Sequence, residues 1–357
     1  MSLIKVILLS HSNSRHLQQI YTGFKMLNDQ NLIQLEQKIV DRLCFNIDKQ
    51  YLKNADHAIL RVILYYNGME IKICYDTHDS FEIIPEYASE SDFYFKRSYL
   101  ASYVKSYKVQ RVKIFPLGLY YLIFSDKVDK FYFWRNLKVD HLNIIYALKR
   151  TIYPYPKLSH LESFPQYFLK PKVIFQTTAH DPYDIKDRPQ EKIEERIKLA
   201  EFRASCIRYL RKELKNKAIV GFVHNKFTKR KYPDLLLDDP KAGQKRNYLN
   251  LLKQIPICVT TTGLHGSIGA KFSEYIALSK AIVTEPLNYS VPGNLTEGQN
   301  YLTFSSPEDC VTKCIELITN KELMKEMMYN NYVYYHSFLK PDKLVLNTLN
   351  IVLKTIV

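Results

Sequence analysis

The stretch 260–275 contains the residues whose types and spacing best suit the binding of an anion. Three of the ten glycines in the chain, Gly263, Gly266 and Gly269, fall within seven residues of it. They lie between an apolar run at 255–260, which predicts a strand, and a helical apolar pattern at 271–279. Glycine lets the backbone approach a ligand closely, and the first turn of a helix offers free N–H groups to an anion. The stretch therefore predicts a phosphate-binding turn, with an ordinary glycine-rich turn as the alternative.

Two charged side chains follow these glycines. Lys271 stands at the start of the expected helix, where a cation is unfavourable unless a bound anion compensates it. Glu274 lies one turn later on the same face, within reach of a ribose whose diphosphate is held by the helix start. A surface Lys–Glu pair is the alternative interpretation.

A second set of candidate residues follows the ends of other expected strands, where a general base that deprotonates a hydroxyl could lie. These residues are His11 after the run 3–10, the group Asp76, His78 and Asp79 after the run 69–75, and the pair His180 and Asp181 after the run 172–176. The alternatives are that the aspartates cap turns or helices and that the histidines are solvated surface residues. We predict His11, Asp76 and Asp79 as the catalytic candidates.

We expect no metal site. The chain has no HExxH motif, and the run 76–79 offers only two carboxylates, which make a poor site for a divalent ion.

The charge of the chain predicts an anionic partner. Lys and Arg number 51 against 36 Asp and Glu, a formal net charge of +15. Two stretches are rich in cations. The first, 96–113, also carries Tyr99, Tyr103 and Tyr107 at helical spacing, a pattern typical of packing, and its cations face solvent or anionic lipid. In the second, 226–246, Arg230 or Lys231 could reach a phosphate, with a solvated loop as the alternative.

The order of the expected elements predicts two α/β domains. A chain of 357 residues favours two domains over one. Strand and helix patterns alternate in both halves, and the dipeptide Asn67-Gly68 predicts a hairpin between the runs 58–66 and 69–75. The stretch 151–171 contains four prolines and predicts a linker. We therefore expect two doubly wound, Rossmann-like domains facing each other across a cleft.

The six cysteines are widely spaced and form no CxxC pattern, which predicts reduced thiols. The apolar run 6–9 is too short for a signal peptide, and no other stretch is suited to span a bilayer. We expect a cytoplasmic protein, with contact at the inner membrane surface left open by its charge.

Several segments of the second half together resemble the donor-binding half of GT-B glycosyltransferases of the family 1/4 type. They are K-x-x-E-Y-x-A at 271–277, P-G at 292–293, E-G-x-N-x-L at 297–302 and P-E at 307–308, and the resemblance covers about 215–345. It implies a nucleotide-sugar donor, such as a UDP- or GDP-sugar, and no other cofactor. By carry-over, Glu274 would bind the ribose, and Lys271 with the backbone of Gly266–Gly269 would hold the diphosphate. Together with the basic stretch 226–246, this predicts the donor-binding residues, which are His265, Gly266, Ser267, Gly269, Lys271, Glu274 and Arg230.

The resemblance also implies a domain plan and a reaction. The plan is an acceptor-side domain at 1–165, a donor domain at 166–338, and a helix at 339–357 that crosses back to the first domain. The reaction is metal-independent transfer of the sugar to a hydroxyl of a glycan, lipid-linked or protein-linked acceptor. The position eight residues after Glu274 is Ile282, so the paired glutamates of many retaining members are not matched and the stereochemistry stays open.

Two other classes of function remain as alternatives. One is a nucleic-acid-binding protein, suggested by the charge and the 28 tyrosines, although no RRM, KH, zinc or helix-turn-helix signature is present. Nucleic acid is therefore not the partner we expect. The other is a catalytically silent module that binds a nucleotide or carbohydrate.

Overall fold

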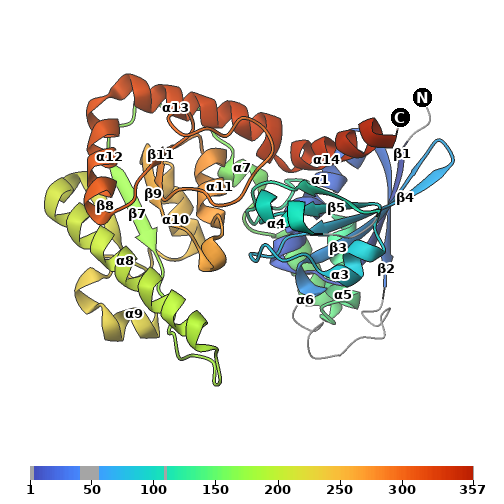
Figure 1. The fold of residues 1–357 in the computed structure, drawn as a ribbon, viewed down its shortest axis with the longest axis horizontal. Coiled ribbons are helices and arrows are strands. Elements are labelled where there is room, and N and C mark those ends of the chain that lie inside the picture. The colour runs from blue at the N-terminus through green and yellow to red at the C-terminus, as the bar shows by residue number, and fades with distance from the viewer. Residues whose placement is uncertain (1–3, 41–55, 108–110, 357) are drawn as a thin grey trace. The chain divides into compact units, whose positions relative to one another are not determined.

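The computed structural model describes residues 4–40, 56–107 and 111–356 (Figure 1). The chain divides into two compact units. Unit 1 comprises residues 1–160, 289–293 and 336–357, and unit 2 comprises residues 161–288 and 294–335. Residues 289–293 thus belong to unit 1, although they lie within the range 166–338 predicted for the donor domain.

Unit 1 contains a six-stranded sheet in the order β2-β1-β3-β4-β5-β6. Its strands are β1 (Ile4–Ser10), β2 (Ile33–Ile39), β3 (Ile59–Tyr66), β4 (Met69–Asp76), β5 (Phe93–Lys96) and β6 (Lys113–Pro116). Only β3 runs antiparallel to its neighbours. The cause is the predicted hairpin, because Asn67 and Gly68 both adopt positive φ, +49° and +77°, as a tight two-residue turn requires. The sheet of unit 1 is therefore mixed, where a purely doubly wound domain would be parallel throughout.

Helices cover both faces of this sheet. The helices of unit 1 are α1 (Gln18–Asp29), α3 (Pro85–Ser89), α4 (Ala101–Ser106), α5 (Lys130–Lys138), α6 (Ile144–Ile152), α7 (Leu158–Leu161) and α14 (Pro341–Ile356). The larger core packs the sheet against α1 and α14, and a smaller one lies on the other face under α3 and α4. Tyr103 and Tyr107 pack against this smaller core, as their spacing predicted. The α7 turn lies within the stretch predicted as a linker.

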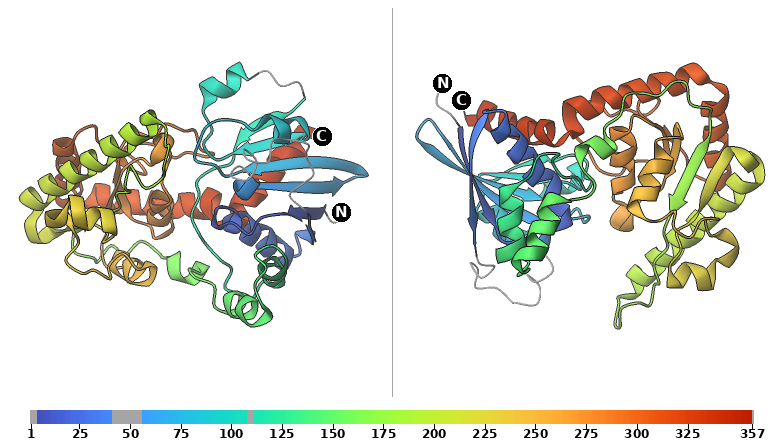
Figure 2. Two further views of the ribbon diagram at one scale, coloured as in Figure 1. Left: turned by 90° about the horizontal axis from the view of Figure 1, so that it is seen from below. Right: turned by 180° about the vertical axis from the view of Figure 1, so that it is seen from behind.

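The last helix belongs to unit 1, as the sequence predicted. It lies along α1 (Figures 1 and 2), and the contact is so close that a Cβ on Gly23 would lie 2.2 Å from the carbonyl oxygen of Pro341. The Tyr75 hydroxyl and the Thr348 hydroxyl lie 2.7 Å apart across the buried face of the helix. Only glycine at position 23 therefore allows α14 to pack on α1 in this way.

Unit 2 contains a fully parallel sheet in the order β11-β10-β9-β7-β8. Its strands are β7 (Val173–Thr177), β8 (Ala218–Phe222), β9 (Ile257–Thr260), β10 (Ala281–Thr284) and β11 (Leu302–Thr303). Its helices are α8 (Gln190–Leu214), α9 (Lys226–Lys231), α10 (Lys245–Leu252), α11 (Ala270–Ala277), α12 (Pro307–Thr319) and α13 (Lys321–Tyr334). Both units are thus Rossmann-like α/β structures, which confirms the predicted fold class.

The cysteines of the described residues are free and buried, in agreement with the prediction of reduced thiols; Cys44 lies outside these residues. In the described part of the chain, no helix combines the length and the apolar character needed to cross a membrane. The same part holds no group of three or more His, Cys, Asp or Glu side chains arranged to bind a metal ion.

Candidate functional site

The carboxyl edge of the sheet in unit 2 is held together by Arg203 on α8. Its Nε donates to Thr261 Oγ1 at 2.8 Å, and its terminal nitrogens donate to the carbonyls of Thr178 at 2.8 Å and Thr262 at 2.9 Å. These bonds join the segments that follow β7 and β9. Burial lowers the pKa of Arg203 to about 10, against the opposing charge of Glu285, so the side chain stays cationic at neutral pH.

The predicted strand, turn and helix are present as β9, the turn 261–269 and α11. His265 and Gly266 both adopt φ of +61°, and a Cβ on Gly266 would lie 2.7 Å from Nδ2 of Asn288. Gly269 is the N-cap of α11, no side chain caps the helix there, and nothing lies within 4 Å of its ideal Cβ position. The positive φ and the nearby Asn288 side chain favour glycine at 266, whereas at 269 the glycine leaves open space in front of the helix start.

Two amides of this turn already bind anionic oxygens. The N–H of Thr262 donates to Oε2 of Glu285 at 2.7 Å, and the N–H of His265 donates to Oε1 of Glu195 at 2.6 Å. The turn therefore presents N–H groups in an arrangement that a carboxylate, and by the same chemistry a phosphate, can occupy.

A pocket of about 630 Å³ opens beside this turn. Its lining residues are Glu191, Glu194, Glu195, Lys198, Leu199, Phe202, Thr262, Gly263, Gly266 and Glu285. Because α8 supplies six of these ten residues and the turn after β9 supplies three, a ligand here would meet both backbone amides and glutamate side chains.

Lys271, Glu274 and Lys245 form a charged group beside the start of α11, in which Glu274 is buried and the two lysines are half-buried. Glu274 is only 3% exposed, and its Oε1 accepts a hydrogen bond from Nζ of Lys245. Nζ of Lys271 donates to the carbonyl of Gln176, and both ammonium groups lie over the ring of Tyr248, at 5.0 and 5.2 Å. The alternative of a surface Lys–Glu pair is therefore wrong.

The electrostatics of this group favour an additional anion. Burial lowers the pKa of Lys271 to about 7, with the neighbouring Glu274 opposing the shift and Lys245 adding to it. The second oxygen of the Glu274 carboxylate, Oε2, is buried and has no hydrogen-bond partner among the described residues. A buried acceptor without a donor is unfavourable unless a ligand supplies one.

The other donor-side candidates are less closely associated with this group. Arg230 is 71% exposed and pairs with Asp181 at 2.8 Å, so its charge is engaged at the surface. Ser267 is buried, and its Oγ faces Gly263 inside the turn. Burial, more than its cationic neighbours, lowers the pKa of His180.

A second cluster lies in unit 1, where β4 and β5 end side by side. Asp76 is fully buried; its Oδ2 accepts from Nζ of Lys96 at 2.8 Å and from the hydroxyl of Tyr94, and its Oδ1 lies 2.8 Å from Nδ1 of His78. Burial would raise the pKa of Asp76, but Lys96 and His78 outweigh it and hold that pKa well below its usual range.

The prediction that Asp76 accepts the proton of an acceptor hydroxyl does not fit this geometry. A buried carboxylate with occupied oxygens and a lowered pKa is a weak base. The arrangement instead orients His78, whose Nδ1 faces the carboxylate and whose Nε2 is buried without a hydrogen-bond partner among the described residues. Asp79 forms an ion pair with Arg97 at 2.6 Å, so its carboxylate is also engaged.

Further imidazoles surround His78. The ring centroids of His57 and His78 lie 5.6 Å apart, those of His16 and His57 lie 5.7 Å apart, and His16 stacks on Tyr120 at 5.3 Å. Burial first, and then the charge of Arg97, lowers the pKa of His16 to about 4. His16 is therefore neutral at pH 7. His11 is buried directly after β1.

Sequence reasoning missed Lys96, His16, His57, Arg203 and Lys245 as members of these sites. Lys96 lies opposite Asp76 in the parallel pair β4–β5, a register that the residue pattern of the two strands does not indicate. Nothing in the residue pattern indicates the buried role of Arg203, because a cation on a long helix is usually solvated.

Substitution of the two glycines separates backbone geometry from ligand space. Gly266→Ala should lower the stability of the protein by about 1–2 kcal/mol, because alanine is strained at positive φ and would meet Asn288. Gly269→Ala should leave the melting temperature unchanged, since its backbone is ordinary and its Cβ meets nothing. If that methyl group lies where a ligand binds, the same variant should weaken nucleotide affinity about tenfold in calorimetric titration. An unchanged affinity would contradict a ligand position in front of Gly269.

The chain matches no family model and no curated protein. Among solved structures it is similar to HepE from Anabaena in complex with UDP and glucose, with 9% identity, 96% of this chain and 98% of that chain covered, and a TM-score of 0.42. A TarM mutant from S. aureus, in complex with fondaparinux, α-GlcNAc-glycerol and UDP, shows 10% identity over 98% of this chain and 99% of that chain, with a TM-score of 0.40. A UDP-GlcNAc 2-epimerase from Neisseria meningitidis bound to UDP-GlcNAc shows 14% identity over 75% of this chain and 63% of that chain, with a TM-score of 0.35.

Two Rossmann-like units in one chain, with the last helix returned to the first unit, agree with the GT-B class of fold expected from the sequence.

Proposed function

We propose that this protein is a glycosyltransferase that moves a sugar from a nucleoside-diphosphate sugar to an acceptor hydroxyl. The observation that carries the proposal is the buried Glu274 with its two lysines, Lys245 and Lys271, beside the start of α11, which no side chain caps and which directly follows the turn 261–269. A UDP- or GDP-sugar is the donor of this proposal, and a glycan, lipid-linked or protein-linked hydroxyl is the acceptor. The proposal also includes a cytoplasmic location, in which the cysteines stay reduced.

In this proposal the helix start and Lys271 bind the diphosphate. The amides of Ala270 and Lys271 come before the first hydrogen bond of the helix, which Phe272 donates to Gly269, and the open space at Gly269 leaves room for phosphate oxygens. A bound diphosphate favours the protonated form of Lys271, whose pKa burial lowers to about 7. Donor binding above pH 7 should therefore take up a proton.

Glu274 binds the ribose in the same proposal. Its Oε1 is held by Lys245, and its buried Oε2 is left to accept a hydrogen bond from a ribose hydroxyl. Such a bond to a charged acceptor contributes about 1.5–3 kcal/mol.

The residues of unit 1 supply the base. His78, oriented by Asp76, takes the proton of the acceptor hydroxyl while the oxygen of that hydroxyl forms a bond to the anomeric carbon. The bond from the anomeric carbon to the diphosphate oxygen breaks, and the nucleoside diphosphate leaves with the bonding electrons. The charge on the leaving diphosphate is neutralised by Lys271 and by the amides at the start of α11.

A thermal-shift screen of UDP, GDP, CMP and dTDP tests the donor. A nucleotide present at a hundred times its dissociation constant should stabilise the protein by about 2.7 kcal/mol, so the matching base should stand out. Transfer assays with sugars of that nucleotide then follow. If none of the four nucleotides raises the melting temperature at millimolar concentration, the proposal is wrong.

A further inference from the structure

Helix α6 of unit 1 carries its large apolar side chains on the outside. Ile144 and Ile145 are 67% and 77% exposed, and Leu148 and Ile152 are exposed as well. These four positions lie within about 100° of the helix circumference, so they form one continuous stripe. A helix packed on the surface of a protein normally turns such a stripe toward the core.

Small and polar residues take the buried face of α6 instead. Ala147 and Thr151 are buried, and Thr151 faces Asn136 of α5, with 3.5 Å between Oγ1 and Nδ2. Because this inner contact is made by a methyl group and a hydroxyl, the orientation of α6 is fixed without its isoleucines. The apolar stripe therefore faces outward on a helix that other side chains hold in place.

Exposed apolar side chains are concentrated between residues 128 and 153 of unit 1. Of the nineteen exposed large apolar side chains in the described residues, eight lie between 128 and 153. They are Val128, Trp134, Ile144, Ile145, Tyr146, Leu148, Ile152 and Tyr153. A patch with this many neighbouring apolar side chains marks an interaction surface. Aromatic residues such as Trp134, Tyr146 and Tyr153 are the type that concentrates at the boundary between lipid and water.

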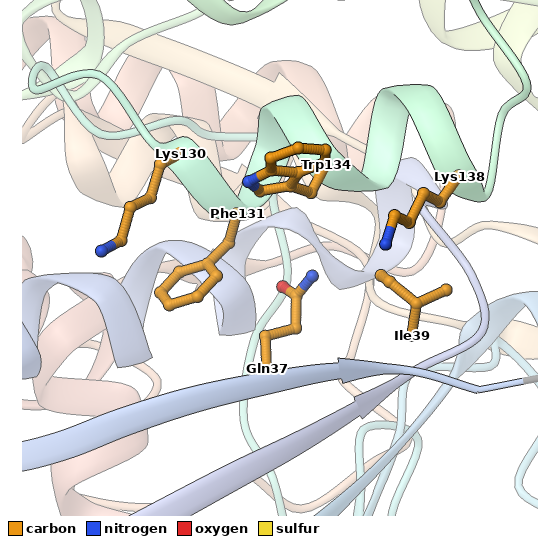
Figure 3. A pocket seen from close by; sticks show the side chains of 6 residues that line it. All are labelled: Gln37, Ile39, Lys130, Phe131, Trp134 and Lys138. Carbon is orange, nitrogen blue, oxygen red and sulfur yellow. The ribbon is translucent and has the colours of Figure 1, made fainter.

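The charges around the patch are positive. The acids of this segment are turned to partners within unit 1: Asp126 accepts from Ser159, Asp129 pairs with Arg135, and Asp140 pairs with Arg150. The lysines of the same segment, Lys127, Lys130, Lys138 and Lys149, make no such ion pair within the described residues. Figure 3 shows Lys130 and Lys138 projecting from α5 on either side of Trp134, and Nζ of Lys138 lies 5.4 Å from the Trp134 ring.

We propose that the α6 stripe (Ile144, Ile145, Leu148 and Ile152) docks on an anionic lipid surface, with the lysines of α5 and α6 contacting the headgroups. An amphipathic helix with a continuous apolar stripe and flanking cations binds in the plane of such a surface. Charge complementarity selects anionic lipid over the other occupants. A second copy of this chain would bring like charges together, and a nucleic acid would leave four aliphatic side chains without an apolar partner.

The α6 stripe lies outside the stretch 96–113, whose cations the sequence analysis placed against solvent or anionic lipid. The sequence offered the cations of 96–113, but Lys96 and Arg97 are buried and engaged with Asp76 and Asp79. They belong to the candidate catalytic cluster and are not available to lipid.

Vesicle sedimentation with the full chain tests the proposal and needs no donor or acceptor, so its outcome is independent of the proposed transferase activity. The protein should bind phosphatidylcholine vesicles that contain 30% phosphatidylglycerol, bind pure phosphatidylcholine far more weakly, and be released as salt rises. Ile145→Glu should reduce the partition coefficient at least tenfold, and Lys149→Gln should reduce it about fivefold.

Ile315→Glu is the matched control, because Ile315 is an exposed isoleucine on α12 of unit 2. The Ile315→Glu variant should bind vesicles as the parent protein does, and all variants should keep the melting temperature of the parent protein. The chain has one tryptophan, so brominated lipid should quench the fluorescence of Trp134, on the helix against which α6 packs. The proposal is overturned if the parent protein does not bind at low salt or if both Ile→Glu variants lose binding equally. Absence of quenching in the bound protein, or an effect of Ile145→Glu on self-association alone, would overturn it as well.

Discussion

Glu274→Gln is expected to weaken nucleoside-diphosphate binding at least 30-fold, which corresponds to about 2 kcal/mol. Glutamine keeps the shape of the side chain but removes the charge that strengthens a hydrogen bond from a ribose hydroxyl to Oε2. The substitution also removes the partner of Lys245, but that lysine is 31% exposed and can turn its ammonium group to water. Affinity is measured by isothermal titration with the nucleotide that the thermal-shift screen selects.

Glu316→Gln is the control for this substitution. Glu316 pairs with Lys313 at 3.7 Å on α12, so the variant also loses a Lys–Glu pair, but one that is exposed. Its nucleotide affinity should remain within twofold of the parent value, and both variants should unfold cooperatively. An affinity of Glu274→Gln equal to that of the control would remove Glu274 from the donor site.

The local arrangement of the donor-side residues could be predicted from the sequence because it depends on neighbours in the chain. An apolar run, three glycines and a helical pattern dictate a strand, a turn and a helix start, whatever surrounds them. The spacing of three residues between Lys271 and Glu274 places both on one helix face. The role of each residue toward a ligand stays a prediction until binding is measured.

Contacts between distant segments could not be predicted in the same way. Arg203 binds the loops after β7 and β9 only because α8 is rotated to face them, and a long helix rich in charge gives no sign of that rotation. The prediction of Asp76 as a base does not fit the structure for the same reason, since the register of β5 places Lys96 beside the Asp76 carboxylate. A strand end predicts where a polar side chain lies but not which partners it meets.

Helix α6 illustrates a third limit. Helical periodicity identifies a stripe of apolar residues, and the usual assumption turns that stripe inward. Here Ala147 and Thr151 make the inner contact, because the polar side chain of Asn136 faces them. Periodicity alone therefore gives the stripe but not the side of the helix that is buried.

His78→Gln is expected to lower kcat for transfer between 100-fold and 10,000-fold, the usual contribution of a general base. The glutamine amide can still donate to Oδ1 of Asp76, so the buried pair of Asp76 and Lys96 keeps its environment. Glutamine has no basic nitrogen, however, and cannot take the proton of the acceptor hydroxyl. Steady-state kinetics with the donor identified by thermal shift provide the measurement.

A fall in kcat without a change in nucleotide binding distinguishes a general base from a structural residue. The donor residues proposed above all belong to unit 2, so the thermal shift caused by the nucleotide should be unchanged in His78→Gln while kcat falls. His141→Gln, at an exposed histidine between α5 and α6, is the matched control and should retain kcat within twofold. If His78→Gln kept its kcat, the base would lie elsewhere in the chain. If the variant lost its nucleotide-induced shift together with kcat, His78 would be needed for the structure of the protein and not for proton transfer.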